Sequence, residues 1–510
     1  HASGTLYLVT RALLSAPHLP VDCPPLPGWH RLERAGGRVV LDLLLGEALP
    51  DAVKWRLQAD ALLLNGTLSP QACVRLARPG ALLLAPEVDA AQRRAFEHAE
   101  FHFEDGAQAR YAPRRPPSPE PLPAERHAIV IGAGLAGASA CERLAARGWR
   151  VTLLEREAAP ARQASGNRAG IFLPVLSRDD NPASRLTRAA YLYAQAQWPR
   201  FGGLGHTIAG AQCGVLQLAR DADHADVQRR IAARWRYPAD YARWLDAGEI
   251  AGVSMPHGAW LYESGGWLEP ASLCRAWLAA CGDALTARFD INVAQLTRDK
   301  DQWQARDAAG ALLAEAPVVI VATGAQQLPQ TAMLPVASVR GQVTHVPSSA
   351  LPPLPYVLCG EAYVTPAHDG IASVGATYDS GDTALSAASQ ADNLARASAL
   401  VDIESGLPLA GRVGFRPVAP DRLPLVGAVP EAIRGAGKPP ERLRDVPRQP
   451  GLYCLLGYGS RGVTWAALAA ECLAAELDGT PVPLEADLRD ALAPGRFLLR
   501  QARHSSTSGQ

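Results

Sequence analysis

The stretch HAIVIGAGLAGASACERLAARGWRVTLLERE, residues 127–157, decides the fold of this chain. It predicts a buried strand, a glycine-rich turn, an amphipathic helix and a second strand that ends at Glu155. This order opens a doubly wound nucleotide-binding domain. In its GxGxxG pattern, Gly132 makes the tight turn, Gly134 lets the backbone approach a pyrophosphate, and Gly137 allows close packing of helix on strand.

A dinucleotide is the expected ligand of this turn. Its phosphates should lie at the helix N-terminus, beside Leu135 and Ala136, where unpaired N–H groups favour an anion. Glu155 follows the glycines by about 20 residues and can accept hydrogen bonds from a ribose hydroxyl, with Arg156 next to it. A glycine turn without a ligand is the competing interpretation. NAD and FAD share the pattern, so it does not choose between them.

Three later segments together favour a flavin. The apolar run VVIVATG (318–324) predicts a buried strand of the same sheet that ends in small residues, where a cofactor can approach the backbone. ASGNRAG (164–170) is small and polar, and GLYCLLGYGSRGVTWAALAAECLAAEL (451–477) predicts a strand, a turn and a helix whose N-terminus favours negative charge. Any of them alone could be a structural loop. Their candidate cofactor-binding residues are Ser165, Gly166, Asn167, Gly170, Ala322, Thr323, Gly324, Gly459, Ser460, Arg461, Gly462, Val463 and Thr464.

Composition limits the class of protein. The chain has 510 residues, 48% hydrophobic and 20% charged, and its 50 basic and 50 acidic side chains cancel. This predicts a globular protein of several domains, with no global charge that would attract nucleic acid or a membrane. No apolar run is long enough to span a membrane. The nine scattered cysteines predict reduced thiols in the cytoplasm, and the histidines form no metal pattern. Because the chain begins with His1, we expect a fragment or a processed protein.

The predicted organisation restarts after a proline-rich linker. Residues 112–124 contain six prolines and predict a stiff, solvated segment. Upstream, VVLDLL (39–44), ADALLLNG (59–66) and GALLLA (80–85) predict a small α/β region with parallel strands. Downstream, a nucleotide-binding domain is expected to interleave with a mixed, mostly antiparallel second domain. The predicted boundaries are 1–111, 112–124 (linker), 125–205 (nucleotide-binding), 206–315 (mainly second domain), 316–335 (nucleotide-binding strand), 336–405 (second domain), 406–480 (nucleotide-binding) and 481–510 (tail).

Several of these motifs resemble a known family. The glycine pattern, the ATG strand, GFRPVAPDRLPLVG (414–427) and GYGSRGVTWA (457–466) are similar to the D-amino-acid oxidase and glycine oxidase class of FAD enzymes. More narrowly, ASGNRAGIFLPVLSRDDNPASRL (164–186), SVRGQVTHV (338–346) and YVTPAHDGIASVGATYDSGD (363–382) resemble the oxidoreductase half of the MnmC family, which makes 5-methylaminomethyl-2-thiouridine in tRNA. The resemblance spans about residues 125–478. It implies a D-amino-acid oxidase-like fold and FAD.

The amino-terminal part resembles the second half of that family's methyltransferase domain. LPGWHRLERAGGRVVLDLLLGEA (26–48) and residues 58–85 carry this likeness. The glycine-rich S-adenosylmethionine loop is absent, and of the family's catalytic segment only Asn65, Gly66 and Pro70 are present. We therefore expect a truncated, inactive methyltransferase-like domain, kept as a structural or tRNA-docking module, and no S-adenosylmethionine in this chain.

The family implies the activity. FAD oxidises the carboxymethylaminomethyl group of the tRNA wobble uridine, and the resulting imine hydrolyses to aminomethyl-uridine and glyoxylate. Arg416 matches the residue that holds the substrate carboxylate in the glycine oxidase class, and a guanidinium suits that planar group; a surface arginine is the bland alternative. Arg461 could face the flavin or cap a helix. Tyr378 and Tyr458 are candidate walls above the flavin ring, although most such tyrosines are packing residues.

Other partners follow less directly. Cys359 lies some distance before the GATY strand, which has no cysteine, so we expect noncovalent FAD. Two arginine clusters could contact tRNA phosphates or be solvated faces: Arg110, Arg114 and Arg115, and Arg229, Arg230, Arg234 and Arg236. A monomer is the expectation, although the sequence leaves the oligomeric state open. The alternatives to the tRNA reaction are a glycine- or sarcosine-type oxidase and a scaffold without turnover.

Overall fold

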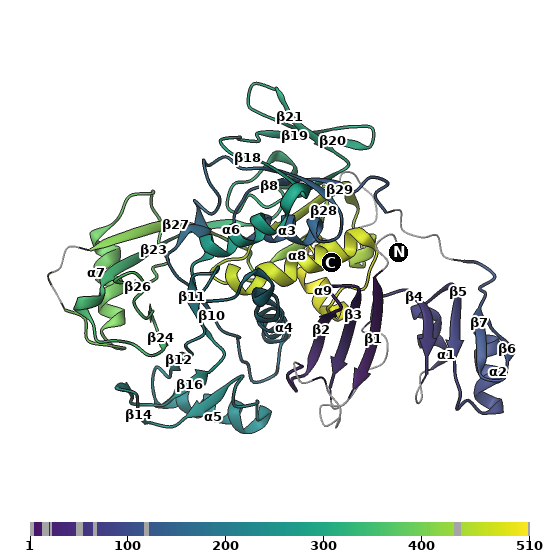
Figure 1. The fold of residues 1–510 in the computed structure, drawn as a ribbon, viewed down its shortest axis with the longest axis horizontal. Coiled ribbons are helices and arrows are strands. Elements are labelled where there is room, and N and C mark those ends of the chain that lie inside the picture. Colours follow the sequence, from purple (N-terminus) through teal and green to yellow (C-terminus); the bar gives the residue numbers. More distant parts are fainter. Residues whose placement is uncertain are drawn as a thin grey trace. The chain divides into compact units, whose positions relative to one another are not determined.

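The computed structural model describes residues 5–12, 20, 23–46, 55–64, 69–116, 122–404, 406, 409–432 and 440–507. The chain divides into two compact units. One is made of His1–Ala124 and Ala475–Asp490, and the other of Glu125–Ala474 and Ala491–Gln510. Figure 1 labels the elements of both, and each unit is described by itself.

The first unit contains two small mixed sheets. The three-stranded sheet has the order β1-β3-β2, and the four-stranded sheet has the order β4-β5-β7-β6. The second sheet packs on a core that includes Leu83, Phe96, Phe101 and Tyr111. The elements are β1 (Leu6–Ala12), β2 (Gly28–Arg34), β3 (Val39–Leu45), β4 (Ala59–Leu63), α1 (Pro70–Leu76), β5 (Ala77–Leu84), α2 (Ala90–His98), β6 (Phe101–Asp105) and β7 (Gln108–Tyr111).

This unit differs from the predicted run of parallel strands. The apolar stretch 39–44 lies in β3, whereas the other two lie in β4 and β5 of the separate sheet. Only β1 with β3 and β4 with β5 pair in parallel; β2 and β7 are antiparallel to their neighbours. The reason is local, because Gly36 and Gly37 adopt positive φ and close a tight β2–β3 hairpin. Pro70 begins α1, whereas Asn65 and Gly66 lie outside the described residues.

The second unit is built on a six-stranded sheet of the doubly wound type. Its order is β18-β9-β8-β22-β29-β28, and every pair is parallel except β28 with β29. The uniformly apolar residues Val318–Val321 form β22 in its centre, as the sequence predicts. Its strands are β8 (His127–Ile131), β9 (Arg150–Leu154), β18 (Leu285–Arg288), β22 (Val318–Val321), β28 (Leu425–Pro430) and β29 (Arg448–Leu456).

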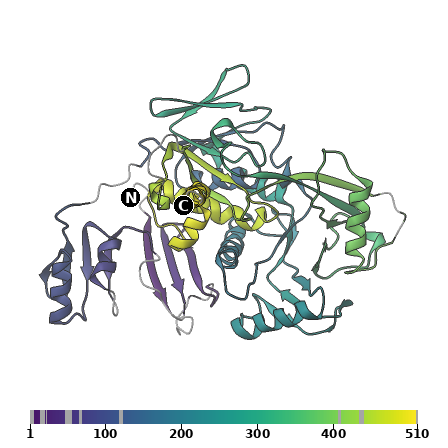
Figure 2. The same cartoon turned by 180° about the vertical axis from the view of Figure 1, so that it is seen from behind.

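An eight-stranded, mostly antiparallel sheet forms the rest of the frame. Its order is β13-β16-β12-β24-β25-β26-β23-β27, and Figures 1 and 2 show α7 lying against its β23 and β26. Strand β27 belongs to it, so this sheet continues past the boundary expected at residue 405. Its strands are β12 (Val215–Leu218), β13 (Arg243–Leu245), β16 (Ala259–Tyr262), β23 (Ala337–Pro347), β24 (Val357–Cys359), β25 (Tyr363–Val364), β26 (Ile371–Gly375) and β27 (Ala410–Val418).

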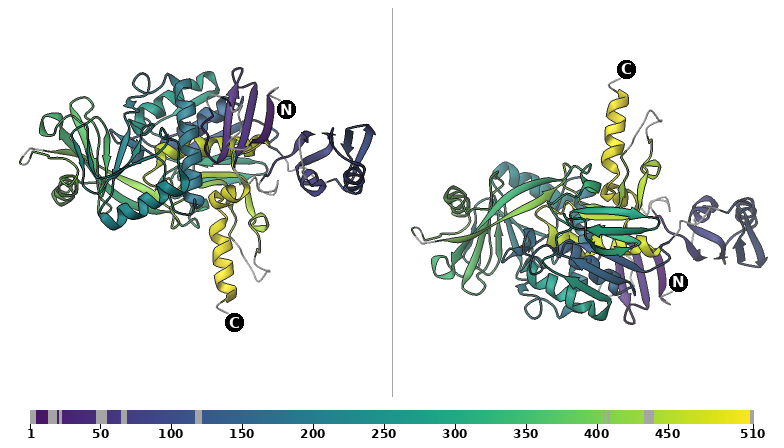
Figure 3. Two further views of the ribbon diagram at one scale, coloured as in Figure 1. Left: turned by 90° about the horizontal axis from the view of Figure 1, so that it is seen from below. Right: turned by 90° about the horizontal axis from the view of Figure 1, so that it is seen from above.

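Helices and smaller sheets complete the second unit. Helix α3 follows the glycine turn and α8 follows β29, as predicted, and Figure 3 shows α10 projecting from the unit. The helices are α3 (Leu135–Ala145), α4 (Pro182–Gln197), α5 (Ala222–Trp235), α6 (Pro270–Ala280), α7 (Ala387–Ala397), α8 (Gly462–Asp478) and α10 (Arg496–Thr507). The end of α8, from Ala475, and most of α9 (Ala486–Leu492) belong to the first unit. The small strands are β10 (Gly170–Phe172), β11 (Gly210–Ala211), β14 (Gly248–Ile250), β15 (Val253–Met255), β17 (Gly266–Leu268), β19 (Gln295–Asp299), β20 (Gln302–Arg306) and β21 (Leu312–Ala316).

Candidate active site

The glycine turn after β8 is packed too tightly for any side chain. Gly132 has φ of +105°, and a Cβ there would lie 2.5 Å from the carbonyl oxygen of Ala322. A Cβ on Gly137 would lie 1.7 Å from the carbonyl oxygen of Gly132. The first contact brings the turn against the end of β22, and the second brings α3 onto the turn. Both glycines are therefore required by close approach of backbone segments.

The N-terminus of α3 is open for an anion. Gly134 is the N-cap residue and provides no side-chain cap. The hydroxyl of Ser165 instead accepts a hydrogen bond of 3.1 Å from the N–H of Leu135. The structure thus brings the ASGNRAG segment onto the start of α3, two regions that the sequence singled out separately. Free N–H groups at a helix start, with no bulk on the glycines, fit a pyrophosphate.

Glu155 lies at the end of β9 and is buried, with 7% of its surface exposed. One carboxylate oxygen accepts a hydrogen bond of 2.5 Å from the N–H of Ala133, and the other accepts one of 2.9 Å from Glu157. The carboxylate therefore holds the glycine turn in place while it also lines the adjoining cavity. Each oxygen keeps a further lone pair, so the predicted ribose contact remains chemically available.

A single cavity of about 800 Å³ joins the edge of the six-stranded sheet to β23 and β27. Its size lies within the range of cofactor and ligand sites, roughly 300–1,000 Å³. Most predicted site residues line it: Gly132, Gly134, Leu135, Ala136, Glu155, Arg156, Ser165, Asn167, Gly170, Ala322, Thr323, Gly324, Tyr378, Arg416, Tyr458, Gly459, Ser460, Arg461, Gly462, Val463 and Thr464.

Gly137 and Gly166 are the two predicted residues that are not in the cavity wall. Gly137 serves the packing of α3 on the turn, as its pattern position suggests. Gly166 makes room for the side chain of Arg412. A Cβ on Gly166 would lie only 2.3 Å from Nη2 of that arginine. Its glycine is thus explained by packing between two protein segments rather than by contact with a ligand.

The turn before α8 is tied to the end of β27. The N–H of Gly459 donates a 2.8 Å hydrogen bond to the carbonyl of Pro417, and Gly457 and Gly459 both have positive φ. This link places the N-terminus of α8 in the cavity wall close to that of α3, because a Cβ on Gly462 would lie 3.0 Å from Cδ1 of Leu135. The exposed side chain of Arg461 lies in this wall. The cavity therefore has two helix N-termini, from chain segments more than three hundred residues apart.

Arg416 extends from β27 into the cavity wall. One guanidinium nitrogen, Nη1, donates a 3.0 Å hydrogen bond to the carbonyl of Thr377, and the group lies 4.5 Å from the centre of the Tyr378 ring. It packs over Gly341, where a Cβ would lie 2.0 Å from Nη1. In the described part of the chain no carboxylate pairs with Arg416. Its remaining donors are therefore available for a planar anion.

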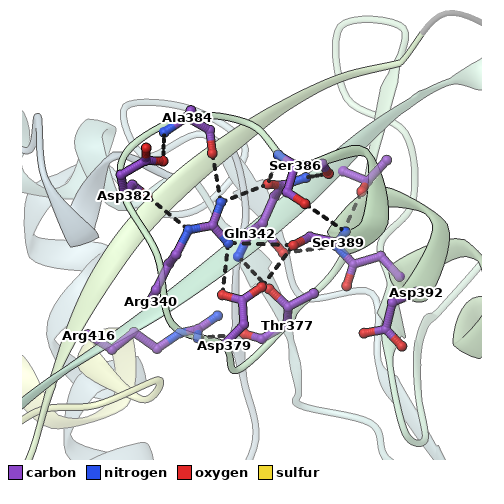
Figure 4. A network of polar contacts seen from close by, with 12 residues as sticks. Arg340, Gln342, Thr377, Asp379, Asp382, Ala384, Ser386, Ser389, Asp392 and Arg416 are labelled. Carbon is purple, nitrogen blue, oxygen red and sulfur yellow. Dashed lines mark hydrogen bonds and ion pairs between the residues drawn. The ribbon is translucent and has the colours of Figure 1, made fainter.

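A buried polar network holds the loop that carries Thr377 and Tyr378 (Figure 4). Arg340 on β23 is 4% exposed and donates to Asp379, at 2.8 Å, and to the carbonyls of Asp382 and Ala384, at 2.9 and 2.7 Å. Nη2 of Arg340 also donates a hydrogen bond to the side-chain oxygen of Gln342.

Gln342 extends the same network. Its backbone N–H donates a 2.9 Å hydrogen bond to the Thr377 hydroxyl, and its side chain exchanges two bonds with the backbone of Ser386. Because Thr377 in turn accepts from Arg416, the network reaches the cavity through one carbonyl. Arg340 and Gln342 thus position Arg416, and neither was among the residues the sequence indicated.

The two predicted tyrosine walls behave differently. Tyr378 is 66% exposed and stacks on Arg416 at the cavity. Tyr458 is 7% exposed, and its hydroxyl is buried without a hydrogen-bond partner. Burial, with Cys454 and Cys472 nearby, raises the pKa of this phenol well above its usual value. The Tyr458 hydroxyl is therefore turned into the core, so it cannot act on a ligand, and only the rest of the residue lines the cavity.

A second strip of wall contains Cys359, which the sequence set apart from the site, and Tyr363, which it did not indicate. Cys359 and Tyr363 pair across the β24–β25 hairpin and both line the cavity. Burial raises the pKa of Cys359 to about 12. Burial also raises the pKa of Tyr363 to about 12, although Arg416 acts in the opposite direction. The pairing of two short strands brings these residues in, and no local pattern marks it.

Three of the seven arginines in the two predicted clusters pair with acidic side chains in the described chain: Arg110, Arg114 and Arg229. Arg229 pairs with Asp226 and with Asp246, the latter at 3.1 Å. In the first unit, Arg110 pairs with Glu104 at 2.9 Å. These guanidinium groups already have partners, which weakens their case as phosphate sites.

Two kinds of feature are absent from the described residues. No group of three or more His, Cys, Asp or Glu side chains could hold a metal ion there. Within the same residues, no helix is both long and apolar enough to cross a membrane.

Comparison with known proteins agrees with this geometry. Residues 127–476 match the family model described as FAD dependent oxidoreductase. Glycine oxidase from Geobacillus kaustophilus shares the fold, with a TM-score of 0.56 and 22% identity over 70% of this chain and 95% of that one. Iminodiacetate oxidase from Chelativorans sp. BNC1 does so with a TM-score of 0.55 and 24% identity, over 70% of this chain and 96% of that one. The fold and the site thus define an FAD-dependent oxidoreductase.

Curated relatives identify the family within that class. The tRNA 5-methylaminomethyl-2-thiouridine biosynthesis bifunctional protein MnmC of Azoarcus sp. is 44% identical, over 94% of this chain and 79% of its own length. The protein of the same name from Paraburkholderia phytofirmans is 42% identical, over 95% of this chain and 80% of its own length. The chain belongs to the MnmC family, as the resemblance predicted.

Proposed function

We propose that this chain removes the carboxymethyl group from 5-carboxymethylaminomethyl-(2-thio)uridine at the tRNA wobble position. The observation that carries this proposal is Arg416, a guanidinium without an acidic partner in the described chain, in the wall of the cavity that also contains the glycine turn. A free carboxylate on the substrate would complete its bidentate hydrogen bonding. The names of the relatives, which state tRNA modification, supply the substrate class.

The residues of the cavity divide into two tasks. We assign the pyrophosphate to the turn at Gly132 and Gly134 and the start of α3, and the adenosine ribose to Glu155. The turn before α8 would face the redox-active ring, where its N–H groups stabilise negative charge. When bound, FAD would supply the acceptor for a hydride, which carries two electrons, from the methylene between the substrate amine and carboxylate. The substrate end is left to Arg416 and Tyr378.

The protein's part in the reaction is mainly positioning. Arg416 holds the carboxylate, so the adjacent CH is kept at a set distance from the ring, and Tyr378 covers the guanidinium on one face. Loss of a hydride and a proton from the CH–NH unit leaves an imine on the substrate. Water then adds to it, and the C–N bond breaks to give aminomethyl-uridine and glyoxylate.

Noncovalent FAD is the expected form. Cys359 lines the cavity, but burial raises the pKa of its thiol to about 12, so the nucleophilic thiolate is scarce near neutral pH. Acid precipitation of the protein should therefore leave the yellow coenzyme in the supernatant. Colour that stays with the pellet would contradict this.

We assign no S-adenosylmethionine site to the first unit. Its described strands form two small mixed sheets, and its sequence lacks the glycine-rich loop that such a site needs. A structural or tRNA-docking role for this unit is consistent with its retention. Because the proposed substrate is tRNA, we expect the protein to work in the cytoplasm.

Anaerobic flavin bleaching tests the proposed function. The purified yellow protein is mixed with tRNA that carries the carboxymethylaminomethyl group and, separately, with glycine and with sarcosine. We expect bleaching by the tRNA, strongly reduced in the Arg416→Ala variant, and glyoxylate in equal amount. Bleaching by the small amines alone would favour a free amino-acid oxidase, and no bleaching by any of them would favour a scaffold without turnover.

A further inference from the structure

A group of cationic side chains lies beside the cavity but outside its wall. We name it the cationic cluster: Arg162, Arg168, His345 and Arg412. Arg162 lies just before the ASGNRAG loop and Arg168 lies within it. His345 lies on β23, and Arg412 lies on the adjacent β27. In the β23–β27 register Arg412 pairs with Val343, so Arg412 and His345 are diagonal neighbours on one sheet face.

The hydrogen bonds of the cluster leave its charge unmatched. Arg412 donates from Nη2 to the carbonyls of Arg162 and Gln163, and neither acceptor is charged. Its Nε is buried without a hydrogen-bond partner, and so is Nε2 of His345. The protein itself therefore leaves two buried nitrogens of the cluster without a hydrogen-bond partner.

Acidic groups near the cluster are scarce. In the described chain the acid that approaches it is Asp369, whose carboxylate lies 3.8 Å from Nη2 of Arg168 and is 74% exposed. The same carboxylate contacts His368 at 3.4 Å. Among the described residues, no acidic side chain pairs with the exposed side chain of Arg162. Three guanidinium groups therefore face one solvated carboxylate.

The electrostatic response of the cluster agrees with this imbalance. Burial, together with Arg168 and Arg412, lowers the pKa of His345. Burial and the neighbouring Arg162 lower the pKa of Arg412. The positive charges of the cluster thus disfavour one another. Arg229, outside the cluster, is instead paired with two aspartates.

The cluster is close to the substrate end of the cavity. Arg412 and Arg416 lie on the same face of β27, four residues or about 13 Å apart along the strand. The loop crosses the strand between them, since Ala164 lies 3.7 Å from where a Cβ of Gly414 would be. A nucleotide whose base substituent reaches Arg416 would therefore carry its backbone toward the cluster.

We propose that the cationic cluster binds phosphodiester groups of the RNA strand that flanks the nucleotide in the cavity. This inference rests on the proposed function and deepens it. Guanidinium groups bind phosphate oxygens in pairs of hydrogen bonds, and the accessible groups of Arg162 and Arg168 can offer such pairs. The exposed Arg162 would make the outermost contact.

The test is tRNA binding by the flavin-loaded full chain, measured by fluorescence anisotropy at several salt concentrations. Arg162→Ala and Arg168→Gln are the cluster variants, and Arg229→Ala is the matched control, an exposed arginine that already has acidic partners. Each cluster variant should weaken tRNA binding by about threefold to tenfold and lower the slope of log K against log salt by about 1. The control should match wild type, and all three proteins should keep their FAD.

The outcomes separate this proposal from the proposed function. Wild-type bleaching by the tRNA, with unchanged affinity and salt slope in both cluster variants, would overturn the cluster alone. Loss of FAD from Arg162→Ala at normal thermal stability would overturn it too, because the cluster would then serve the coenzyme. Wild-type protein that neither binds nor is bleached by the tRNA would overturn both.

Discussion

Replacing Arg340 by methionine should loosen the substrate end of the site from a distance. Methionine has a similar length but no donors, so the loop loses its bonds to Asp379, Asp382 and Ala384. The variant leaves the cavity wall chemically intact, because Arg340 does not line it. The substitution instead loosens the loop that holds Thr377 in place. The carbonyl of Thr377 accepts the hydrogen bond that orients Arg416.

The magnitudes follow from these contacts. Removing one partner of a buried ion pair costs about 3–5 kcal/mol, and we expect the lower end because the loop can open to water. A hydrogen bond to a charged group contributes about 1.5–3 kcal/mol. If Arg416 loses the support of Thr377, kcat/KM should therefore fall by about tenfold to a hundredfold, since 1.36 kcal/mol corresponds to one factor of ten.

The assay combines thermal unfolding with stopped-flow flavin reduction by the modified tRNA. Arg275→Met is the control, because its 3.0 Å pair with Glu269 is exposed and contributes at most about 1 kcal/mol. We expect Arg340→Met to retain FAD, to unfold at a lower temperature than the control, and to reduce its flavin more slowly at limiting substrate. An Arg340→Met protein that matches the control in both measurements would refute the reasoning.

Three further changes have defined outcomes. Gly137→Ala puts a Cβ 1.7 Å from the carbonyl oxygen of Gly132, so most of the FAD absorbance per protein should be lost; full flavin content would contradict the packing argument. Arg416→Lys should keep FAD but raise KM for the tRNA by about tenfold or more, because lysine cannot bind a carboxylate in two places; steady-state kinetics at equal flavin content decide. Burial alone would raise the pKa of Asp379, but hydrogen bonds, chiefly from Arg340, hold it below 3.8. The ionised Asp379 therefore stabilises the folded protein fully above pH 3.8, and this stabilisation is lost as the pH falls through the lower folded-state pKa. The difference in free energy of unfolding between wild type and Asp379→Asn should accordingly become smaller in acid.

The cofactor end of the site was predictable because its determinants are local. The glycines, the strand before them and Glu155 lie within one βαβ unit, where spacing along the chain sets distance in space. The same holds for the turn before α8. Even there, the backbone contacts of Glu155 and the packing role of Gly166 needed the three-dimensional structure.

The substrate end was predictable only in part. Family resemblance pointed to Arg416 and Tyr378, but it could not show that Tyr458 turns its hydroxyl into the core. Cys359 and Tyr363 enter the wall through a hairpin of two very short strands. Such pairing depends on neighbours far along the chain, and no periodic pattern records it.

The amino-acid sequence by itself determined the dinucleotide turn, the central apolar strand and the family, because strand periodicity and glycine spacing are properties of short segments. Only the tertiary structure decided which charges are matched. Arg229 looked like a phosphate ligand until its aspartates were placed beside it, whereas Arg412 and His345 became neighbours through the register of β23 and β27. Charge compensation acts through space over a few ångströms, and the partners in a folded chain come from segments that composition cannot bring together.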